Sequence, residues 1–178
     1  MSKRRSDKGY SLVEMIIVLA IIALVATMAL ISVSVIHSAK AKDAASTVDA
    51  ELATLITRSK NMNSDEEGWD YAARIYKDGS IFYYQKGYYN PETNAYKWSD
   101  RVSLTSYVDV RYAANKAVPD GDASEQKVEE MNSGNGLYIR FSKNGTCVEG
   151  AGDIRFCKRN GNVVANVYIR KNGSHQLR

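Results

Sequence analysis

Cysteine, histidine and proline are scarce in this sequence, and each shortage narrows what the protein can do. The 178 residues include two cysteines and two histidines, and no two of these four are closer than ten residues apart. A zinc site or a Cys-x-x-Cys redox pair needs more ligands at closer spacing. Gly-x-Ser-x-Gly, His-Glu-x-x-His and Walker-type glycine loops are also absent. We therefore predict a protein that is not an enzyme and that needs no metal and no cofactor.

Proline and glycine are both absent from residues 10–62, so nothing in this stretch forces a helix to break. Within it, residues 15–36 are apolar apart from three hydroxyl side chains. As a helix these 22 residues span about 33 Å, which matches the hydrocarbon core of a bilayer. The run is therefore predicted to cross a membrane.

Basic residues dominate the start of the chain, where four of them precede the apolar run and only one acid accompanies them. By the positive-inside rule this bias holds the N-terminus in the cytoplasm and places the chain after residue 36 outside. A cleaved secretory signal is an alternative, because Ala39-Lys40-Ala41 has the small-x-small pattern of its cleavage site. The apolar run is longer than such signals use, which favours an anchor.

Glu14 lies one residue before the apolar run. Carrying an ionised carboxylate into hydrocarbon costs roughly 3 kcal/mol on insertion scales. An acid at this place therefore indicates a function and a cationic partner. The plainer alternative is a charge that only decorates the end of the helix.

Gly9, followed by Tyr-Ser-Leu-Val-Glu and then Met-Ile-Ile-Val-Leu-Ala-Ile-Ile-Ala-Leu, resembles the class III signal of type IV prepilins and pseudopilins. That pattern is a short basic leader, a glycine, an aromatic residue and a glutamate as the fifth mature residue. In this family a membrane-embedded aspartyl peptidase cuts after the glycine and usually methylates the new N-terminus. The resemblance implies that Gly9 and Tyr10 form the cleavage site and that Tyr10 is N-methylated. It also implies that Glu14 meets the N-terminal amine of a neighbouring subunit, a pair that would fix the axial register of a filament.

Between Ser38 and Met62 apolar residues recur at three- and four-residue spacing, which predicts that the helix continues to about Asn61 with one face against a sheet. The predicted fold class is α+β, with a long helix packed on an antiparallel β-sheet head, as in type IV pilins. The predicted divisions are a cytoplasmic leader at 1–9, a membrane or filament-core helix at 10–36, an amphipathic helix at 37–62 and an extracytoplasmic β-rich head at 63–178.

Residues 69–112 are rich in tyrosine and predict strands, with Asp78-Gly79 as a hairpin turn. Strands are expected at 72–76, 81–85, 96–98 and 102–110, with a loop at 88–95 and a turn at Ser99-Asp100. Nine of the 12 tyrosines fall in this segment. Alternation along strands sends half of them to the core and leaves half on a pleated surface, where tyrosine is favoured in any case. A glycan- or substrate-contacting surface around Tyr83, Tyr84, Tyr88 and Tyr89 is the alternative.

The remainder of the chain predicts a loop and then a second group of strands. Residues 113–136 predict a long exposed loop with one helical turn at 124–131. In the last 42 residues three Asn-Gly turns predict an antiparallel meander, with strands at 137–142, 146–148, 153–158, 163–170 and 174–177. This part is weakly similar, at 139–145 and 167–173, to the C-terminal sheet of minor pilins of the type II secretion H and fimbrial T group, a resemblance that favours a minor subunit.

Cys147 and Cys157 fall on strands predicted to be neighbours outside the membrane. A disulfide between them is expected and would contribute about 2–3 kcal/mol in the chain-entropy model. Two buried thiols are the alternative. The acidic clusters at 65–67 and 120–122 lack the ligand spacing of a calcium loop and are expected to be ordinary solvated loops.

Charge is divided unevenly along the head. Residues 61–135 hold 13 acids and eight bases, whereas residues 136–178 hold two acids and eight bases. This asymmetry can steer identical subunits head to tail, or attract DNA or another anionic surface, and it is also compatible with an ordinary solvated face.

The function predicted from these patterns is that of a structural subunit of a type IV pilus or of a secretion or competence pseudopilus. Its partners would be the prepilin peptidase and methylase, other pilin subunits, the assembly platform and the membrane. It would be a single-pass protein of the inner or cytoplasmic membrane before assembly, and part of an extracellular or periplasmic filament afterwards. The alternative is a signal-anchored extracellular module that binds DNA, glycan or protein and forms no filament.

Overall fold

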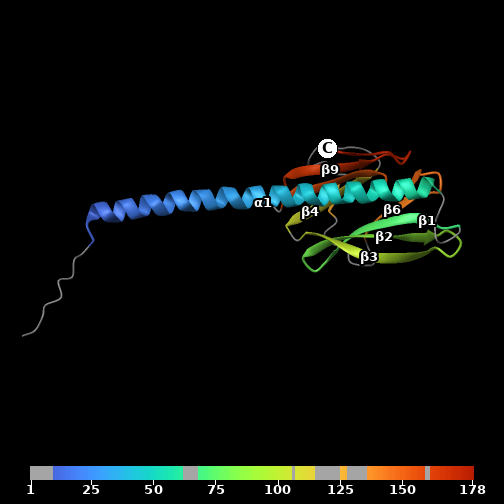
Figure 1. Ribbon diagram of the computed structural model, residues 1–178, viewed down its shortest axis with the longest axis horizontal. Coiled ribbons are helices and arrows are strands. Elements are labelled where there is room, and N and C mark those ends of the chain that lie inside the picture. Colours follow the sequence, from blue (N-terminus) through green and yellow to red (C-terminus); the bar gives the residue numbers. More distant parts are fainter. Residues whose placement is uncertain (1–9, 62–67, 106, 115–124, 128–135, 159–160) are drawn as a thin grey trace, which may run out of the picture. The chain divides into compact units, whose positions relative to one another are not determined.

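The computed structural model describes residues 10–61, 68–105, 107–114, 125–127, 136–158 and 161–178. The leader at 1–9 and both acidic clusters considered for calcium lie outside the described residues. The chain divides into two compact units, residues 1–36 and residues 37–178. One helix, α1 (Leu12–Lys60), contributes its first half to the first unit and its second half to the second (Figure 1).

The described strands of the second unit form two five-stranded antiparallel sheets. The first sheet, sheet A, has the order β3-β2-β1-β6-β7 and is built from β1 (Asp70–Asp78), β2 (Ile81–Asn90), β3 (Ala95–Thr105), β6 (Leu137–Phe141) and β7 (Cys147–Glu149). The second, sheet B, has the order β10-β9-β8-β4-β5 and is built from β4 (Val108–Ala114), β5 (Glu125–Lys127), β8 (Gly152–Lys158), β9 (Val163–Ile169) and β10 (His175–Leu177). The predicted α+β class is confirmed.

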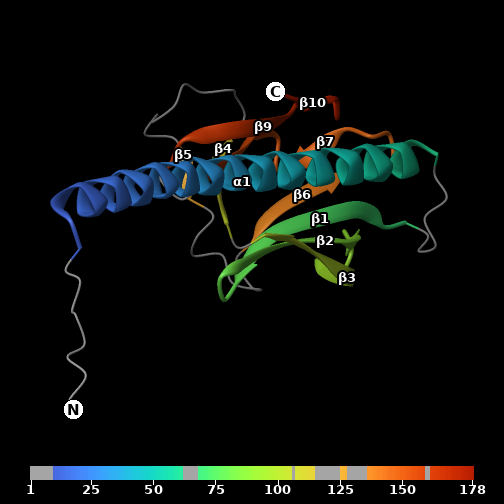
Figure 2. The same cartoon turned by 60° about the vertical axis from the view of Figure 1, so that its left-hand side comes forward.

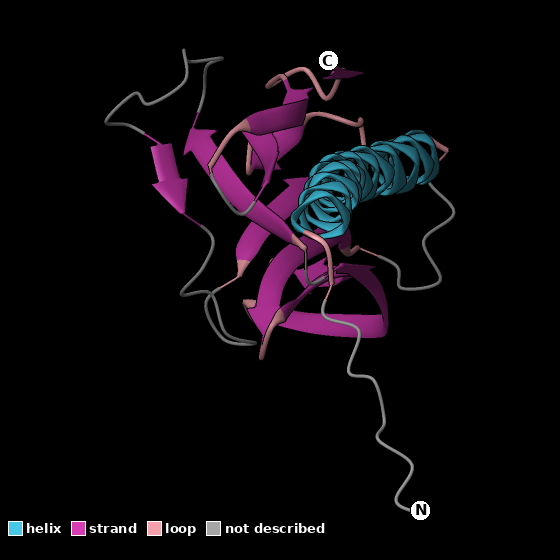
Figure 3. Ribbon diagram, turned by 90° about the vertical axis from the view of Figure 1, so that its left-hand side faces the viewer, coloured by secondary structure: helices cyan, strands magenta, loops and turns pink. Residues whose placement is uncertain are grey.

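The core of the second unit joins the helix to both sheets. The buried stripe of the helix recurs at three- and four-residue spacing, as the pattern predicted, and consists of Ala41, Ala44, Ala45, Val48, Leu52, Leu55 and Ile56. It packs with alternate residues of sheet A, such as Ile75 and Phe141, and of sheet B, such as Val110 and Phe156. Figure 2 shows the second half of α1 running along the strands of the head, and Figure 3 shows strands both above and below the line of the helix. The helix is therefore the element that both sheets share.

One ion pair and one close polar contact connect this half of the helix to both sheets. Glu51 pairs with Lys86 of β2 at 2.7 Å, and Asp49 lies 3.4 Å from the imidazole of His175 in β10. Side chains of this exposure contribute little energy each. Their effect is to fix which way the helix is turned about its axis.

The Asn-Gly turns explain why five strands of the C-terminal part were predicted to within one or two residues. In the turn after β6, the N–H of Gly145 donates to the Ser142 carbonyl at 2.8 Å, and φ of Gly145 is 79°. The turn after β9 repeats this arrangement, with Gly173 donating to Arg170 at 2.9 Å and a φ of 80°. Only glycine adopts such a conformation without strain, so these positions fix the strand ends.

Four expectations about the strands were wrong. The C-terminal strands do not form one meander, because the chain passes from sheet A to sheet B between β7 and β8. Residues 88–90 belong to β2, and Ser99-Asp100 is not a turn, because β3 continues through it with a register shift against β2. Within the region predicted as a helical turn, residues 125–127 form the strand β5. In each case ladder pairing with a distant segment decides the structure, which local turn residues do not report.

Candidate processing site and surfaces of the head

The N-terminus of α1 is closed by a reciprocal pair of hydrogen bonds between Ser11 and Glu14. The backbone N–H of Ser11 donates to the Glu14 carboxylate at 2.9 Å, and the N–H of Glu14 donates to the Ser11 hydroxyl at 3.2 Å. This is a capping box, in which the side chains of the N-cap and N3 residues satisfy backbone donors that have no partner within the helix. The Ser-x-x-Glu spacing could have been read from the sequence, but the role of Ser11 was not predicted.

The capping box gives Glu14 a defined place at the head of the apolar run. A carboxylate at a helix N-terminus is favoured by the helix dipole. Because a carboxylate has about four acceptor positions, the Ser11 bond leaves capacity for a cation as well. Tyr10, directly before Ser11, is 83% exposed, and Gly9 lies outside the described residues. The site therefore consists of the exposed Tyr10 and a carboxylate three residues into the capped turn.

No described part of the chain packs over the apolar first half of α1. Across the candidate membrane span none of the described residues is buried, and large side chains such as Ile16, Leu24 and Val35 are 57, 60 and 62% exposed. A soluble monomer rarely exposes a continuous apolar surface of this extent. This half of the helix requires lipid or other apolar helices around it.

The four tyrosines of the predicted surface divide between the two faces of sheet A. Tyr84 is fully buried in the core and Tyr88 packs against that core, on the side that faces α1. The expectation that Tyr84 contributes to a surface is therefore wrong, because residues alternate between faces along β2. Burial raises the pKa of the Tyr84 phenol, with the nearby Glu51 carboxylate adding to the effect. Tyr83 and Tyr89 point to the opposite, outer face.

The outer face of sheet A carries a continuous set of aromatic rings and arginines, which we call the aromatic–arginine face. Its rings stack across strands at centroid distances of 4.8–5.9 Å, and its guanidinium groups lie 4.1–4.7 Å from ring centroids. The members are Arg74, Tyr76, Tyr83, Tyr89, Tyr96, Trp98, Arg101, Tyr138 and Arg140. Trp98 lies over Gly87, where any Cβ would collide with its ring. Such stacked pairs stabilise the outer face of a sheet that no other described helix or strand covers.

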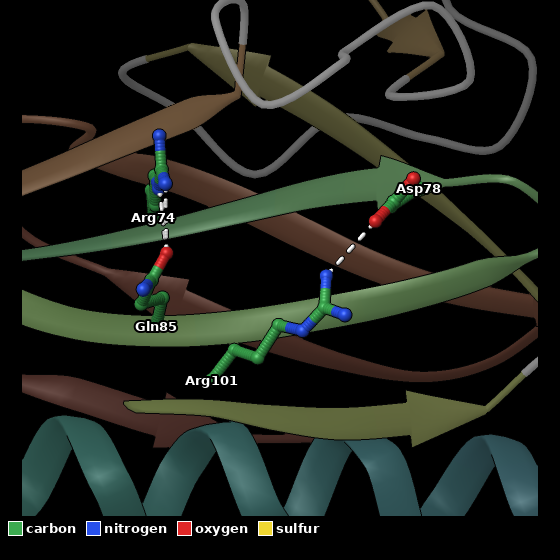
Figure 4. A network of polar contacts seen from close by, with 4 residues as sticks. All are labelled: Arg74, Asp78, Gln85 and Arg101. Atoms are coloured by element: carbon green, nitrogen blue, oxygen red, sulfur yellow. Dashed lines mark hydrogen bonds and ion pairs between the residues drawn. The ribbon is translucent and has the colours of Figure 1, made fainter. Parts of the chain in front are cut away.

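Several polar groups of the aromatic–arginine face have partners within the face itself (Figure 4). Arg74 donates twice to the Gln85 amide oxygen, at 3.0 and 2.8 Å, and Arg101 pairs with Asp78 at 2.9 Å. Burial, with the Glu149 carboxylate nearby, raises the pKa of Tyr96 to about 12, so this phenol is neutral at physiological pH. The neutral rings and the contacts among them give this face a structural role. Its net charge is small, because Asp78 lies against Arg101 and Glu149 lies 3.7 Å from Arg140, while Arg74 keeps its charge beside the neutral Gln85 amide.

The two cysteines are buried thiols, and the expected disulfide is not formed in this structure. Cys147 belongs to β7 of sheet A and Cys157 to β8 of sheet B, so they are not on neighbouring strands. The Cys147 thiol donates to the Glu149 carbonyl at 3.1 Å. Burial raises its pKa to about 11. With this pKa the free thiol is protonated at neutral pH, which makes it a poor nucleophile.

Sheet B buries an ion pair that the sequence did not indicate. Asp153 and Arg155 lie on the face of β8 opposite to the core residues Ile154 and Phe156, yet their side chains are only 1 and 4% exposed. Arg155 donates to Asp153 at 3.2 Å, and the amide of Asn166 donates to the second Asp153 oxygen at 2.7 Å. The residues that contribute to this group come from two paired strands, so linear spacing carried no signal for it. Among the described residues no group of three or more His, Cys, Asp and Glu side chains is placed to hold a metal ion.

Comparison with known proteins identifies the N-terminal signal. The family described as the prokaryotic N-terminal methylation motif matches residues 4–30. This match covers most of the basic N-terminal segment, the Gly9–Tyr10 bond, the capping box and most of the apolar run. No curated protein and no solved structure shows significant similarity to the chain.

The signal and the fold together define the class of the protein. The chain carries a type IV pilin-like prepilin signal, and its long apolar helix leading into antiparallel sheets is a type IV pilin-like α+β fold. The signal and the helix support a type IV pilin-like precursor that is anchored in the membrane. Proteins with this motif are typically structural and not enzymatic.

Proposed function

We propose that the protein is a structural subunit, and specifically a minor subunit, of a type IV pilus or of a type II secretion or competence-like pseudopilus. The observation that carries this proposal is the combination of a capped Glu14 and an uncovered apolar helix directly after a prepilin signal. The loose C-terminal resemblance to minor pilins, at 139–145 and 167–173, favours the minor role.

Processing would take place at the boundary between Gly9 and Tyr10. Cleavage there by the prepilin peptidase creates an ammonium group on Tyr10, one residue before the capped turn, and the same enzyme methylates that amine. A secondary amine of this kind stays cationic at neutral pH. Glu14 thereby gains the cation that an acid at the edge of hydrocarbon requires.

Assembly would exchange lipid for neighbouring helices around the apolar half of α1. Van der Waals packing between apolar helices replaces contacts with acyl chains. The pair between Glu14 of one subunit and the Tyr10 amine of the next penalises an incorrect register, because a shifted subunit would leave a charge unpaired in an apolar surrounding. The assembly platform would draw the subunit from the inner or cytoplasmic membrane into a filament outside it.

The first test is the intact mass and N-terminal sequence of the protein recovered from its own host. We expect a chain that begins at Tyr10 and carries one added methyl group. A chain that begins at Met1 would contradict processing and support a plain signal anchor, and one that begins near Lys42 would identify a secreted protein.

The second test separates the charge of Glu14 from its capping function. Glu14→Gln keeps an oxygen that accepts the Ser11 N–H, whereas Glu14→Ala removes both functions. If register depends on the charge, both variants lose incorporation into filaments although the head stays folded. Ser11→Ala is the matched control, because it weakens the cap and leaves the carboxylate. Normal function of Glu14→Ala without filament incorporation would instead favour an anchored module that binds DNA, glycan or protein.

A further inference from the structure

Several strand ends of the head meet near the point where the helix enters it. Phe82 pairs with Thr105, so the β1–β2 turn lies beside the end of β3. Lys158, at the end of β8, pairs with Val108, at the start of β4. Tyr107 is between these two pairs in the chain, and its ring stacks on His37 of α1 with centroids 5.2 Å apart and planes 22° from parallel. His37 is the first residue of the second unit.

Tyr107 is exposed although it is a large aromatic residue. Its side chain is 47% exposed, and its backbone N–H is held by the Thr105 hydroxyl at 3.2 Å. The stack on His37 holds the Tyr107 ring in place but leaves it exposed to solvent. An ordered, half-exposed phenol has an apolar body and a polar tip, which is the chemistry that prefers the headgroup layer of a membrane.

In the chain, this end of the head follows the apolar run directly. Ile36 is the last residue of the apolar run, and His37 follows it directly. One helical residue advances the chain by about 1.5 Å, so the residue that stacks on Tyr107 leaves the hydrocarbon at the level of the headgroups.

The charges at this end suit an anionic surface. Asp78 pairs with Arg101 at 2.9 Å and Asp109 pairs with Arg111 at 3.3 Å, so these two acids are neutralised locally. Lys77 at the end of β1 adds positive charge, with its amine 5.4 Å from the centroid of the Phe82 ring. Lysines near a membrane surface are attracted to acidic phospholipids.

We propose that this end of the head is a phospholipid-contacting surface, in which Tyr107 and the β1–β2 turn rest among the headgroups of the outer leaflet while the protein is anchored. The contact would orient the head before any assembly step. The proposal rests on the membrane anchor and is independent of filament formation.

Photo-crosslinking of the full chain in nanodiscs of phosphatidylethanolamine and phosphatidylglycerol tests the proposal. Tyr107→p-benzoylphenylalanine places a reactive ketone at the proposed contact. Val148 is the matched control, because it is 53% exposed and lies at the opposite end of sheet A. Its neighbour Cys147 pairs with Phe141, and Phe141 pairs with Tyr71, which is about 23 Å along β1 from Asp78.

We expect at least about fivefold more lipid adduct, measured by intact mass, from position 107 than from position 148, because the headgroup layer is narrow. Equal yields, or adducts with protein but not lipid at position 107, would overturn the proposal. Ser80, exposed in the β1–β2 turn, gives a second labelled position that decides the matter if the Tyr107 variant does not fold. Co-elution with the nanodisc verifies the anchor separately.

Discussion

The two halves of α1 have the same helical backbone but depend on different surroundings. In the first half, leucine, isoleucine and valine point outward in every direction and none of the described side chains is buried. In the second half one narrow stripe is buried, and three of its seven members are alanines at the end nearer the first half. Small side chains allow the helix axis to approach the sheets closely.

This contrast shows that helix formation and helix burial are separate properties of the sequence. Both halves form a helix because no proline or glycine interrupts them. The first half lacks a polar face and must therefore find apolar partners outside its own chain, whereas the second half is complete once the head has folded. Substitutions at matched positions in the two halves should consequently have opposite phenotypes.

The largest expected effect is that of a charge placed on the buried stripe. Val48→Asp puts an unpaired carboxylate at a position with 0% exposure and should cost about 4 kcal/mol or more, which is enough to unfold many domains. Val25→Asp, at a position that is 61% exposed, should leave the head folded and weaken membrane retention. Near-UV circular dichroism in detergent measures the head, and alkaline extraction of membranes measures retention. Equal losses of head structure in both variants would show that the halves are not independent.

A cavity in the second half should have the next largest effect. Leu52→Ala removes a fully buried side chain and should lower the free energy of unfolding by about 3 kcal/mol. Leu24→Ala, at a position that is 60% exposed, should change it by less than about 0.5 kcal/mol. Chemical denaturation in detergent, followed by tryptophan emission from the head, measures both. A comparable loss in Leu24→Ala would mean that the apolar half is packed against the head.

Two glycine substitutions test the packing of the turns near the C-terminal end of α1. Lys60 crosses Gly145, and the Gly173 turn lies against the carbonyl of Gly145, where any Cβ at position 173 would collide with it. Gly173→Ala should therefore cost about 2 kcal/mol from steric conflict and a positive φ. Gly79→Ala has a φ of 62° and open space around it, so it should cost only about 1 kcal/mol. If the two substitutions lower the melting temperature equally, the turns are not packed together.

The buried thiol beside the second half predicts a dependence on alkaline pH. The pKa of Cys147 is raised by burial from 9.0 to about 11. Between these values the unfolded thiol loses its proton while the folded one keeps it, so stability present below pH 9 declines as the pH rises towards 11. Cys147→Ala should flatten this part of the profile, as measured by chemical denaturation across that pH range. Iodoacetamide should label Cys147 only after the protein unfolds. Adding a reductant should leave the mass of the native protein unchanged.

The smallest expected effect is that of removing the ion pair between Glu51, in the second half of α1, and Lys86 of β2. Lys86→Met removes the 2.7 Å pair with Glu51, whose partners are 30 and 26% exposed, and should cost about 0.5 kcal/mol. The cost should shrink in 1 M salt, where the Debye length is about 3 Å. A cost above about 2 kcal/mol that does not change with salt would show that the pair orients the helix more strongly than its exposure suggests.

Local signals in the sequence specified those parts of the structure that depend on neighbouring residues. The uninterrupted helix and the strands bounded by Asn144-Gly145 and Asn172-Gly173 were predicted closely, because their determinants lie within a few residues. The separation of Cys147 from Cys157, the burial of Asp153 and the continuation of β3 through Ser99 depend on which strands pair. That pairing is set by contacts distant in sequence, so no local pattern reported it.

The prepilin signal was readable for the same reason, since it is a contiguous motif. The hydrogen-bond geometry within this motif was harder to predict. The Ser11 bond to Glu14 follows from a known capping pattern, yet the interpretation of Glu14 as a subunit contact drew attention away from it. Both roles use the same carboxylate, and the Glu14→Gln variant distinguishes them.

The Asn-Gly turns also affect the chemical degradation of this protein over time. Asparagine followed by glycine is the sequence most open to deamidation, in which the glycine nitrogen attacks the asparagine side-chain carbonyl. Here the Gly145 and Gly173 nitrogens donate to Ser142 and Arg170, while the Asn144 and Asn172 oxygens each accept an N–H two residues on, at 3.0 Å. The two reacting groups are thus held in separate hydrogen bonds. A folded head therefore keeps its asparagines for as long as these turns stay closed, and deamidation measured at these sites would report that the turns have opened.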